Sequence, residues 1–316
     1  MSESGASTNR HGPRVWAIGG GKGGVGKSVI SASLAASLAH GGQRVAIVDA
    51  DLGGANLHTL LGIPNPKINL QDFMSKTVSD LSEVMVPTTL DNLWRVSGAQ
   101  ALVEAANLNS GQKGELLRHI NALEADHVVL DLGAGSAFNV LDFFLVARKG
   151  VLVVVPEPTS VENAYHFLKA ALFRKLKRAQ PRAQVRAAIA DVMAEGSRDL
   201  VRTPRDLISR VWSVDPEAGA ALVAEASSFR PALIVNRAQH PSHEALGEDM
   251  VTACRDYFGV RLQFLGALPN DQLVVRSVME RRPATEFHTK IPFIAALDGA
   301  IEKLTDARRR TAGRSV

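Results

Sequence analysis

Residues 21–28 read Gly-Lys-Gly-Gly-Val-Gly-Lys-Ser and fit the pattern G-x-x-x-x-G-K-[ST]. A short apolar run, Arg14–Gly19, precedes them, and small apolar residues at helical spacing, Ser28–His40, follow. Between a strand and a helix, such a glycine-rich loop points backbone N–H groups inward at phosphate oxygens, and the helix N-terminus adds partial positive charge. The segment therefore predicts a phosphate-binding loop within an α/β fold.

The residues of this loop suit a nucleoside triphosphate better than a dinucleotide. The stretch also fits G-x-G-x-x-G, with Asp49 at the end of the next strand, which is the dinucleotide pattern. A dinucleotide gains nothing from a lysine aimed at a γ-phosphate, so Lys27 and Ser28 favour ATP. Lys27 would reach the β- and γ-phosphates, and the Ser28 hydroxyl would ligate Mg²⁺. The predicted nucleotide-binding residues here are Gly21, Lys22, Gly23, Gly24, Val25, Gly26, Lys27 and Ser28.

Strand and helix patterns alternate along the chain, which is typical of a parallel sheet with helices on both faces. We therefore expect an α/β fold with a mostly parallel, doubly wound sheet. The expected strands are 14–19, 44–49, 93–96, 127–132, 151–155, 232–236 and 262–266, and the expected helices are 28–40, 112–123, 160–178, 272–280 and 292–308.

The length of 316 residues fits one α/β domain with additional segments. We expect residues 1–13, which are small and polar, to form a mobile tail and residues 14–316 to form a single domain. About fifty residues, at about 179–230, carry no good strand pattern, which is long for an α/β connection. Helical patterns occur there instead, so we expect a helical insertion.

Acidic residues follow two of the apolar strands. Asp49 ends the second expected strand and Asp51 follows it, and Asp131 lies near the end of the strand at 127–132. Because ligands bind at the carboxyl ends of strands in such sheets, these residues are expected beside the phosphate loop. Asp131 would hold Mg²⁺ through water, Asp51 would orient the attacking water, and Asp49 would support the water shell of the metal. Glycines at 53, 54, 133 and 135 would let the loops move. The alternative is that these carboxylates only cap helices.

Three segments together resemble the ParA/MinD family of deviant Walker A P-loop ATPases. They are Lys-Gly-Gly-Val-Gly-Lys-Ser at 22–28, Asp-Ala-Asp-Leu-Gly-Gly-Ala-Asn at 49–56 and Asp-Leu-Gly-Ala-Gly at 131–135. The resemblance covers about residues 15–304. It implies an ATP-dependent homodimer in which Lys22 crosses to the nucleotide of the partner. It also implies the hydrolytic role for Asp51, the Walker B role for Asp131 and a switch role for Asn56.

Later segments extend the resemblance. Asn236 and Arg237 end a strand where the family places an asparagine against adenine, and Pro269 and Asp271 match a Gly-x-x-Pro-x-Asp segment whose proline lies against the base. Residues 131–136 and 156–165 resemble the FlhG/FleN-like branch, whose members regulate flagellar number and placement. The resemblance thus implies ATP and Mg²⁺ as cofactors, and a slow, activator-stimulated ATPase that works as a switch for a cell-pole machine.

Two other functions stay open. One is a ParA-like partitioning ATPase that binds nucleoid DNA nonspecifically, for which residues 174–186 offer a basic cluster. The other is a nucleotide-gated adaptor with little turnover, whose helical insertion binds a protein partner. A membrane surface is a further candidate partner, since four arginines lie among the last nine residues.

Composition excludes several classes. The single cysteine, Cys254, rules out a disulfide within the chain and a cluster or zinc site held by several thiolates. That separates the chain from family members that carry iron–sulfur clusters. Only two tyrosines occur, Tyr165 and Tyr257, so the C-terminal tyrosine cluster of related kinases is missing. No apolar run reaches the roughly 18 residues of a membrane-spanning helix, so we expect a cytoplasmic protein, with peripheral positions at the inner membrane, cell pole or nucleoid left open.

Overall fold

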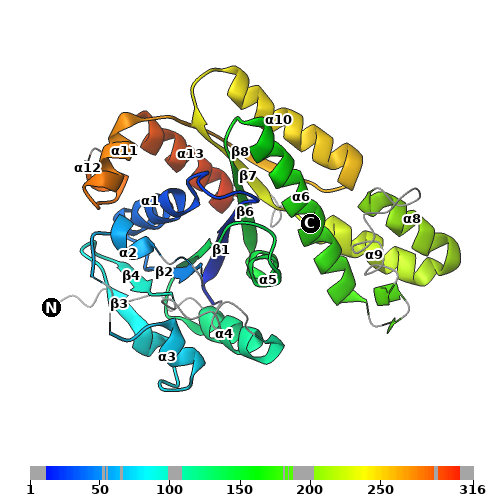
Figure 1. Ribbon diagram of the computed structural model, residues 1–316, viewed down its shortest axis with the longest axis horizontal. Coiled ribbons are helices and arrows are strands. Elements are labelled where there is room, and N and C mark those ends of the chain that lie inside the picture. Colours follow the sequence, from blue (N-terminus) through cyan, green and yellow to red (C-terminus); the bar gives the residue numbers. More distant parts are fainter. Residues whose placement is uncertain are drawn as a thin grey trace, which may run out of the picture.

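The computed structural model describes residues 12–51, 54, 56–64, 67–98, 109–180, 182–183, 185–187, 203–287 and 291–306. Its centre is an eight-stranded sheet in the order β3-β4-β2-β5-β1-β6-β7-β8 (Figure 1). Every neighbouring pair is parallel except β3–β4. The strands are β1 (Arg14–Gly19), β2 (Val45–Ala50), β3 (Met85–Pro87), β4 (Leu93–Val96), β5 (His127–Leu132), β6 (Lys149–Val154), β7 (Ala232–Ala238) and β8 (Gln263–Pro269).

Helices cover both faces of this sheet (Figure 1). Along β1, Ala17 belongs to one buried apolar cluster and Ile18 to the other, because successive side chains of a strand point to opposite faces. The prediction of a mostly parallel sheet with helices on both faces is confirmed. The helices are α1 (Lys27–His40), α2 (Leu57–Leu60), α3 (Leu70–Met74), α4 (Ser110–Ala122), α5 (Phe138–Val146), α6 (Pro158–Ala179), α8 (Pro204–Val214), α9 (Pro216–Ser228), α10 (Ser242–Ala253), α11 (Gln272–Met279), α12 (Ala284–Phe287) and α13 (Pro292–Asp306), with a 3₁₀ turn at Leu81–Val84 and a π-helical turn at Cys254–Phe258.

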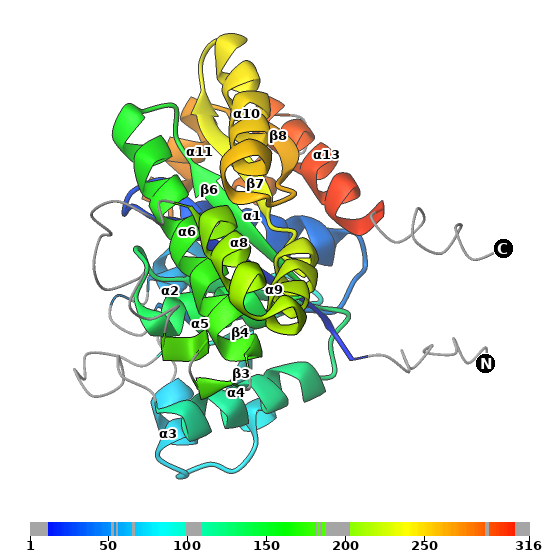
Figure 2. The same ribbon diagram turned by 90° about the vertical axis from the view of Figure 1, so that its right-hand side faces the viewer.

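Two helices, α8 and α9, lie within the range expected for the helical insertion, and Figure 2 shows them beside α6. Ala218 and Leu222 of α9 are buried and join the same apolar cluster as α6. We therefore propose that the insertion is part of a single domain. Pro181, Gln184 and residues 188–202 lie outside the described residues, as do residues 1–11 of the expected tail.

Four cations of the basic cluster at 174–186 form ion pairs with acidic side chains of the same chain. Arg174 and Arg178 both bind the buried Asp142, at 2.8 and 3.2 Å. Lys175 lies 2.6 Å from Glu225 of α9, and Arg182 binds Asp215 and Glu217. These ion pairs connect α6 and the residues just after it to α5 and to α9, so these side chains also hold the helices together.

Within the described residues, no helix is both long and apolar enough to cross a membrane.

His127, at the start of β5, gives the fold a dependence on pH. It is 3% exposed and accepts a hydrogen bond from the indole N–H of Trp16 at 2.9 Å. Burial, and then repulsion by Arg14, lower its pKa from 6.5 to about 4. Between these values the unfolded chain binds a proton that the folded chain does not, so stability falls as pH falls. The loss is about 3 kcal/mol, at about 1.4 kcal/mol for each pKa unit.

We expect His127→Gln to reduce the difference in the free energy of unfolding between pH 7.5 and pH 4.5, because glutamine has no proton to gain. Urea unfolding at the two pH values measures it. The exposed His240→Gln is the matched control and should keep the wild-type difference. An unchanged difference in His127→Gln would show that other groups cause the acid sensitivity.

Candidate nucleotide-binding site

The predicted phosphate loop connects the end of β1 at Gly19 to the start of α1 at Lys27. Gly24 and Gly26 adopt φ angles of 78° and 93°, in the left-handed region that glycine tolerates. The side-chain amide of Asn236 donates to the carbonyl of Val25 at 2.8 Å, and a Cβ added to Gly26 would lie 2.3 Å from that amide nitrogen. Asn236 of β7 is thus hydrogen-bonded to the phosphate loop at Val25. At the next residue, Gly26, a side chain would clash with the same amide.

Lys27, the first residue of α1, is 8% exposed, and its ammonium group lies 3.4 Å from the carbonyl oxygen of Lys22. Burial lowers its pKa, while the carboxylates of Asp131 and Asp51 oppose that effect. The lysine therefore lies between the loop backbone and the acidic strand ends, which brings together the residues predicted from two separate motifs.

Asp131 lies at the buried end of β5. The Ser31 hydroxyl donates to its carboxylate at 2.8 Å, and the Ser28 hydroxyl also hydrogen-bonds to it. Burial raises the pKa of Asp131 to about 6, although these hydrogen bonds and Lys27 favour the charged form. Asp131 is thereby held against the first turn of α1.

Asp49 is the register partner of Asp131 in the β2–β5 pairing. Its carboxylate accepts hydrogen bonds from the backbone N–H groups of Asp51 at 3.3 Å and Leu57 at 3.2 Å. Burial, and then the neighbouring Asp131, raise its pKa to about 7. The carboxylate of Asp51 packs against Gly133, since a Cβ there would lie 2.9 Å from Asp51 Oδ1. Three carboxylates thus meet where β2 and β5 end.

This donor set fits a magnesium ion. Mg²⁺ prefers oxygen ligands and retains several waters, and the site offers the Ser28 hydroxyl beside carboxylates. Burial is the main cause of the raised pKa values of Asp49 and Asp131, and repulsion among the three carboxylates adds to it; a divalent cation would relieve that repulsion. In the part of the chain that the structure describes, no group of three or more His, Cys, Asp and Glu side chains forms a complete metal site by itself. Water and the phosphates of a nucleotide would supply further oxygen ligands.

Lys22 extends away from these carboxylates. Its ammonium group lies 3.1 Å from Glu157 Oε2 and 3.1 Å from Thr159 Oγ1, just beyond the end of β6. The side chains of Lys22 and Glu157 are 41% and 55% exposed. The side chain of this lysine is therefore held at the surface and points out of the phosphate loop to which its backbone belongs.

The remaining predicted residues lie around the same edge of the sheet. Asn56 is exposed and donates from its amide to the Gly54 carbonyl at 2.7 Å. Arg237, near the end of β7, is exposed with a φ of 56°. Pro269 ends β8, and Asp271 caps α11 by accepting from the N–H of Leu273 at 2.9 Å. Gly53, expected in a mobile loop, lies outside the described residues.

Sequence reasoning missed two residues. Ser31 lies one helical turn after Lys27 on the same face of α1, and this spacing was the available signal that it faces the same site. Arg95 lies in β4 and is 1% exposed. Its guanidinium nitrogens have no hydrogen-bond partner among the described residues, and burial lowers its pKa while Asp49 opposes the shift. An arginine within an apolar strand was the available signal.

Comparison with known proteins places this geometry in context. A family model described as "ParA: NUBPL iron-transfer P-loop NTPase" matches residues 13–179. The antiactivator FleN of Pseudomonas aeruginosa is 37% identical over 163 residues, which is 50% of this chain and 56% of FleN. The flagellum site-determining protein YlxH of Helicobacter pylori is 32% identical over 170 residues, which is 51% of this chain and 54% of YlxH. The aligned part thus spans little more than half the length of these curated relatives.

A solved structure, the septum site-determining protein MinD of Pyrococcus horikoshii complexed with Mg-ADP, superposes with a TM-score of 0.62. It covers 94% of this chain and 97% of that one, at 20% identity, which shows a shared fold. The iron transfer in the family description has no thiolate counterpart in the matched range, because the single cysteine is Cys254.

Proposed function

Because the chain belongs to the ParA/MinD family of P-loop ATPases, we propose that it binds ATP with Mg²⁺ at the loop 21–28 and hydrolyses it slowly. The observation that carries the proposal is the meeting of Asp49, Asp51 and Asp131 beside Lys27 and Ser28. Ser28 and Asp131 would hold the metal, Asp49 would support its water shell, and Asp51 would orient the attacking water. Asn236, Arg237, Pro269 and Asp271 would surround the base.

ATP would favour a homodimer in which Lys22 contacts the nucleotide of the partner. The present contact of Lys22 with Glu157 is an exposed ion pair, and such pairs contribute about 0–1 kcal/mol. A charge-assisted hydrogen bond to phosphate in a water-excluded interface is stronger. Lys22 can therefore leave Glu157 and bind a phosphate with little loss of free energy. The ion pair with Glu157 would be the position of the lysine when no ATP is bound.

Lys22→Ala should keep most of its ATP affinity and weaken ATP-dependent dimerisation at least about tenfold, since a hydrogen bond to a charged group contributes about 1.5–3 kcal/mol. Sedimentation at several protein concentrations measures this. Glu157→Gln is the matched control, because it removes the resting partner and leaves the lysine, so its dimer should be at least as tight. Equal dimerisation of Lys22→Ala and wild type would remove Lys22 from the interface.

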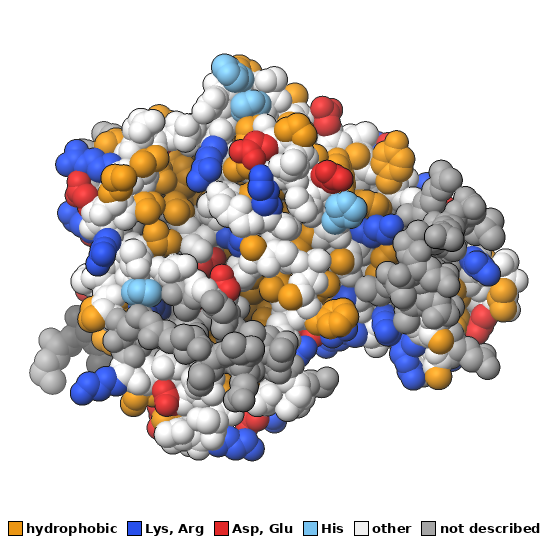
Figure 3. Space-filling view, viewed as in Figure 1, with side chains coloured by type: hydrophobic (Ala, Val, Ile, Leu, Met, Phe, Trp, Pro, Cys, Tyr) orange, Lys and Arg blue, Asp and Glu red, His pale blue; other side chains and the backbone are white. Residues whose placement is uncertain are grey.

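The surface near the site also suits an interface between two copies. Helix α11 begins three residues after Pro269 at the end of β8, and its Val275 and Met279 are 46% and 81% exposed. Figure 3 shows hydrophobic side chains gathered over α11 and α12 on this face. Exposed apolar groups of this kind commonly mark contact surfaces.

For the cellular role, we propose regulation of the number or placement of flagella, with the protein in the cytoplasm and bound peripherally at the pole. The identity to FleN and YlxH supports it. A protein partner would bind the insertion, where Trp212, Val214 and Val223 of α8 and α9 are exposed. Deletion of the gene should change flagellar number per cell. If plasmid or chromosome partition failed instead, with normal flagella, the partitioning function would replace this one.

A further inference from the structure

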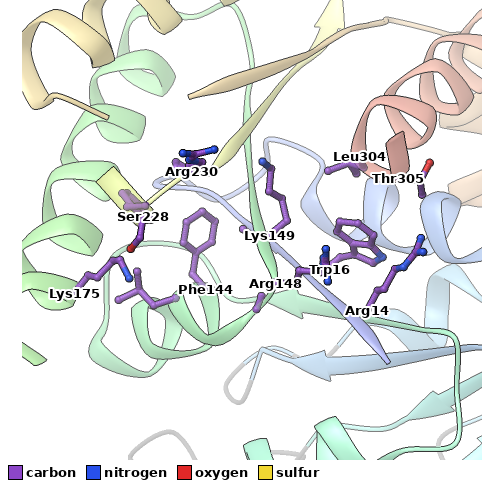
Figure 4. A pocket seen from close by; sticks show the side chains of 15 residues that line it. Arg14, Trp16, Phe144, Arg148, Lys149, Lys175, Ser228, Arg230, Leu304 and Thr305 are labelled. Atoms are coloured by element: carbon purple, nitrogen blue, oxygen red, sulfur yellow. The ribbon is translucent and has the colours of Figure 1, made fainter. Parts of the chain in front are cut away.

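A second hollow, of about 280 Å³, opens at the other end of the sheet from the phosphate loop (Figure 4). The phosphate loop follows the last residue of β1, whereas Arg14 and Trp16 at the start of β1 line this hollow. Lys149 at the start of β6 and Arg230 just before β7 also line it. The C-terminal ends of α9 and α13 close its sides. The hollow is therefore a separate feature that the proposed ATPase does not use.

The charged side chains that line the hollow are all positive. Five lysines and arginines line it, and among the described lining residues none is Asp or Glu. Lys175 is paired with Glu225 at 2.6 Å. Within the described part of the chain, Arg14, Lys149 and Arg230 form no salt bridge. The lining cations are Arg14, Arg148, Lys149, Lys175 and Arg230.

These cations affect one another. Lys149 is half-buried, and Figure 4 shows its side chain extending between Arg230 and Trp16. Burial, and then repulsion from Arg230 and Arg148, lower the pKa of Lys149. Gathering like charges around a partly buried ammonium group destabilises the charged form, and no described carboxylate lies in the lining to offset it. A bound anion would offset it.

We propose that this hollow is a binding site for a small phosphate-bearing anion, such as pyrophosphate or the phosphate groups of a nucleotide or sugar phosphate. Arginine and lysine are the side chains that bind phosphate oxygens most strongly. The volume of about 280 Å³ is just below the roughly 300–1,000 Å³ of small-molecule sites, which suits a compact ligand. A concave site whose cations converge from several segments suits a compact ligand better than a nucleic-acid backbone, which binds along an extended basic stripe.

The hollow also offers an apolar wall for the rest of such a ligand. Phe144 is 1% exposed and Trp16 3% exposed, and both rings line it. Trp16 is fixed by its hydrogen bond to His127, so this wall is rigid. The combination of fixed apolar groups with a few converging cations is typical of small-ligand sites.

Calorimetric titration with pyrophosphate tests the proposal. Lys27→Ala serves as background, because it weakens anion binding at the phosphate loop. In that background we expect one remaining site, and Lys149→Gln with Arg230→Gln should weaken it at least about tenfold, since each contributes charge-assisted hydrogen bonds. Arg261→Gln with Lys67→Gln removes two exposed cations elsewhere and is the matched control for net charge. Unchanged pyrophosphate affinity in the double variant would overturn the proposal.

Further measurements distinguish a loss of ligand binding from a loss of stability, and a small anion from DNA or lipid. Lys149→Gln alone replaces a cation whose neighbours are cations, so it should unfold at the wild-type temperature or above it, and pyrophosphate should stabilise it less than wild type. A large fall in the melting temperature of Lys149→Gln without ligand would instead show that the cation stabilises the fold, for example at the nearby helix ends. That result would overturn the proposed site. Binding of duplex DNA or phosphatidylglycerol vesicles that depends on Lys149 and Arg230, with no binding of pyrophosphate, would also contradict it.

Discussion

Asp51→Ala is expected to bind ATP and to hydrolyse it about 10²–10⁴-fold more slowly than wild type, the range for loss of a group that positions or activates a nucleophile. The carboxylate of Asp51 lies against Gly133, beside Lys27 and the buried Asp131, and it accepts no hydrogen bond from the described residues. For this reason we propose Asp51, of the three carboxylates, as the one that would orient the attacking water.

Phosphate release under single-turnover conditions measures this effect. Because hydrolysis would no longer dissolve the dimer, Asp51→Ala with ATP should also remain dimeric over hours. The exposed Asp256→Ala, which alters only a local pair with Arg255, is the control and should hydrolyse ATP at the wild-type rate. A wild-type rate in Asp51→Ala would transfer the water-positioning role to another residue.

Lys27→Ala should lose ATP affinity by about 10- to 150-fold, corresponding to about 1.5–3 kcal/mol for hydrogen bonds to a charged group. The effect is expected to be large because Lys27 is 8% exposed, so a contact between its ammonium group and a phosphate would be shielded from water. Its removal also leaves Asp131 and Asp51 without their nearby cation.

Titration with a fluorescent ATP analogue measures that affinity. Lys22→Ala provides the comparison within the same loop, because it should retain ATP affinity while losing dimerisation. If both lysine variants lost ATP affinity equally, Lys27 could not be assigned to binding of the chain's own nucleotide and Lys22 to dimerisation alone.

Much of the fold was predictable because its strands are buried on both faces and therefore form continuous apolar runs. The ranges 14–19, 93–96 and 127–132 match β1, β4 and β5. The antiparallel β3 was not predicted, since Met-Val-Pro is short and contains a proline, which suits an edge strand but gives a weak signal. Helix α5 was also missed, because Phe138–Val146 is too uniformly apolar to show a helical stripe.

At the site, residue types and order predicted the meeting of Lys27, Asp131 and Asp49, since strand ends in a parallel sheet gather at one edge. Contacts made by specific side-chain geometry were not predictable. The amide of Asn236 donates to the loop carbonyl of Val25, and Arg95 lies buried near Asp49. No spacing in the sequence predicts either contact, because each depends on how segments far apart in the chain pack together.

The dimeric switch is the central claim, and its most direct test is the molecular mass of the full chain with each nucleotide. Sedimentation equilibrium with Mg²⁺ and a non-hydrolysable ATP analogue should give a dimer, and with Mg²⁺ and ADP a monomer. Identical masses in the two nucleotide states, measured across the same range of protein concentration, would contradict the account.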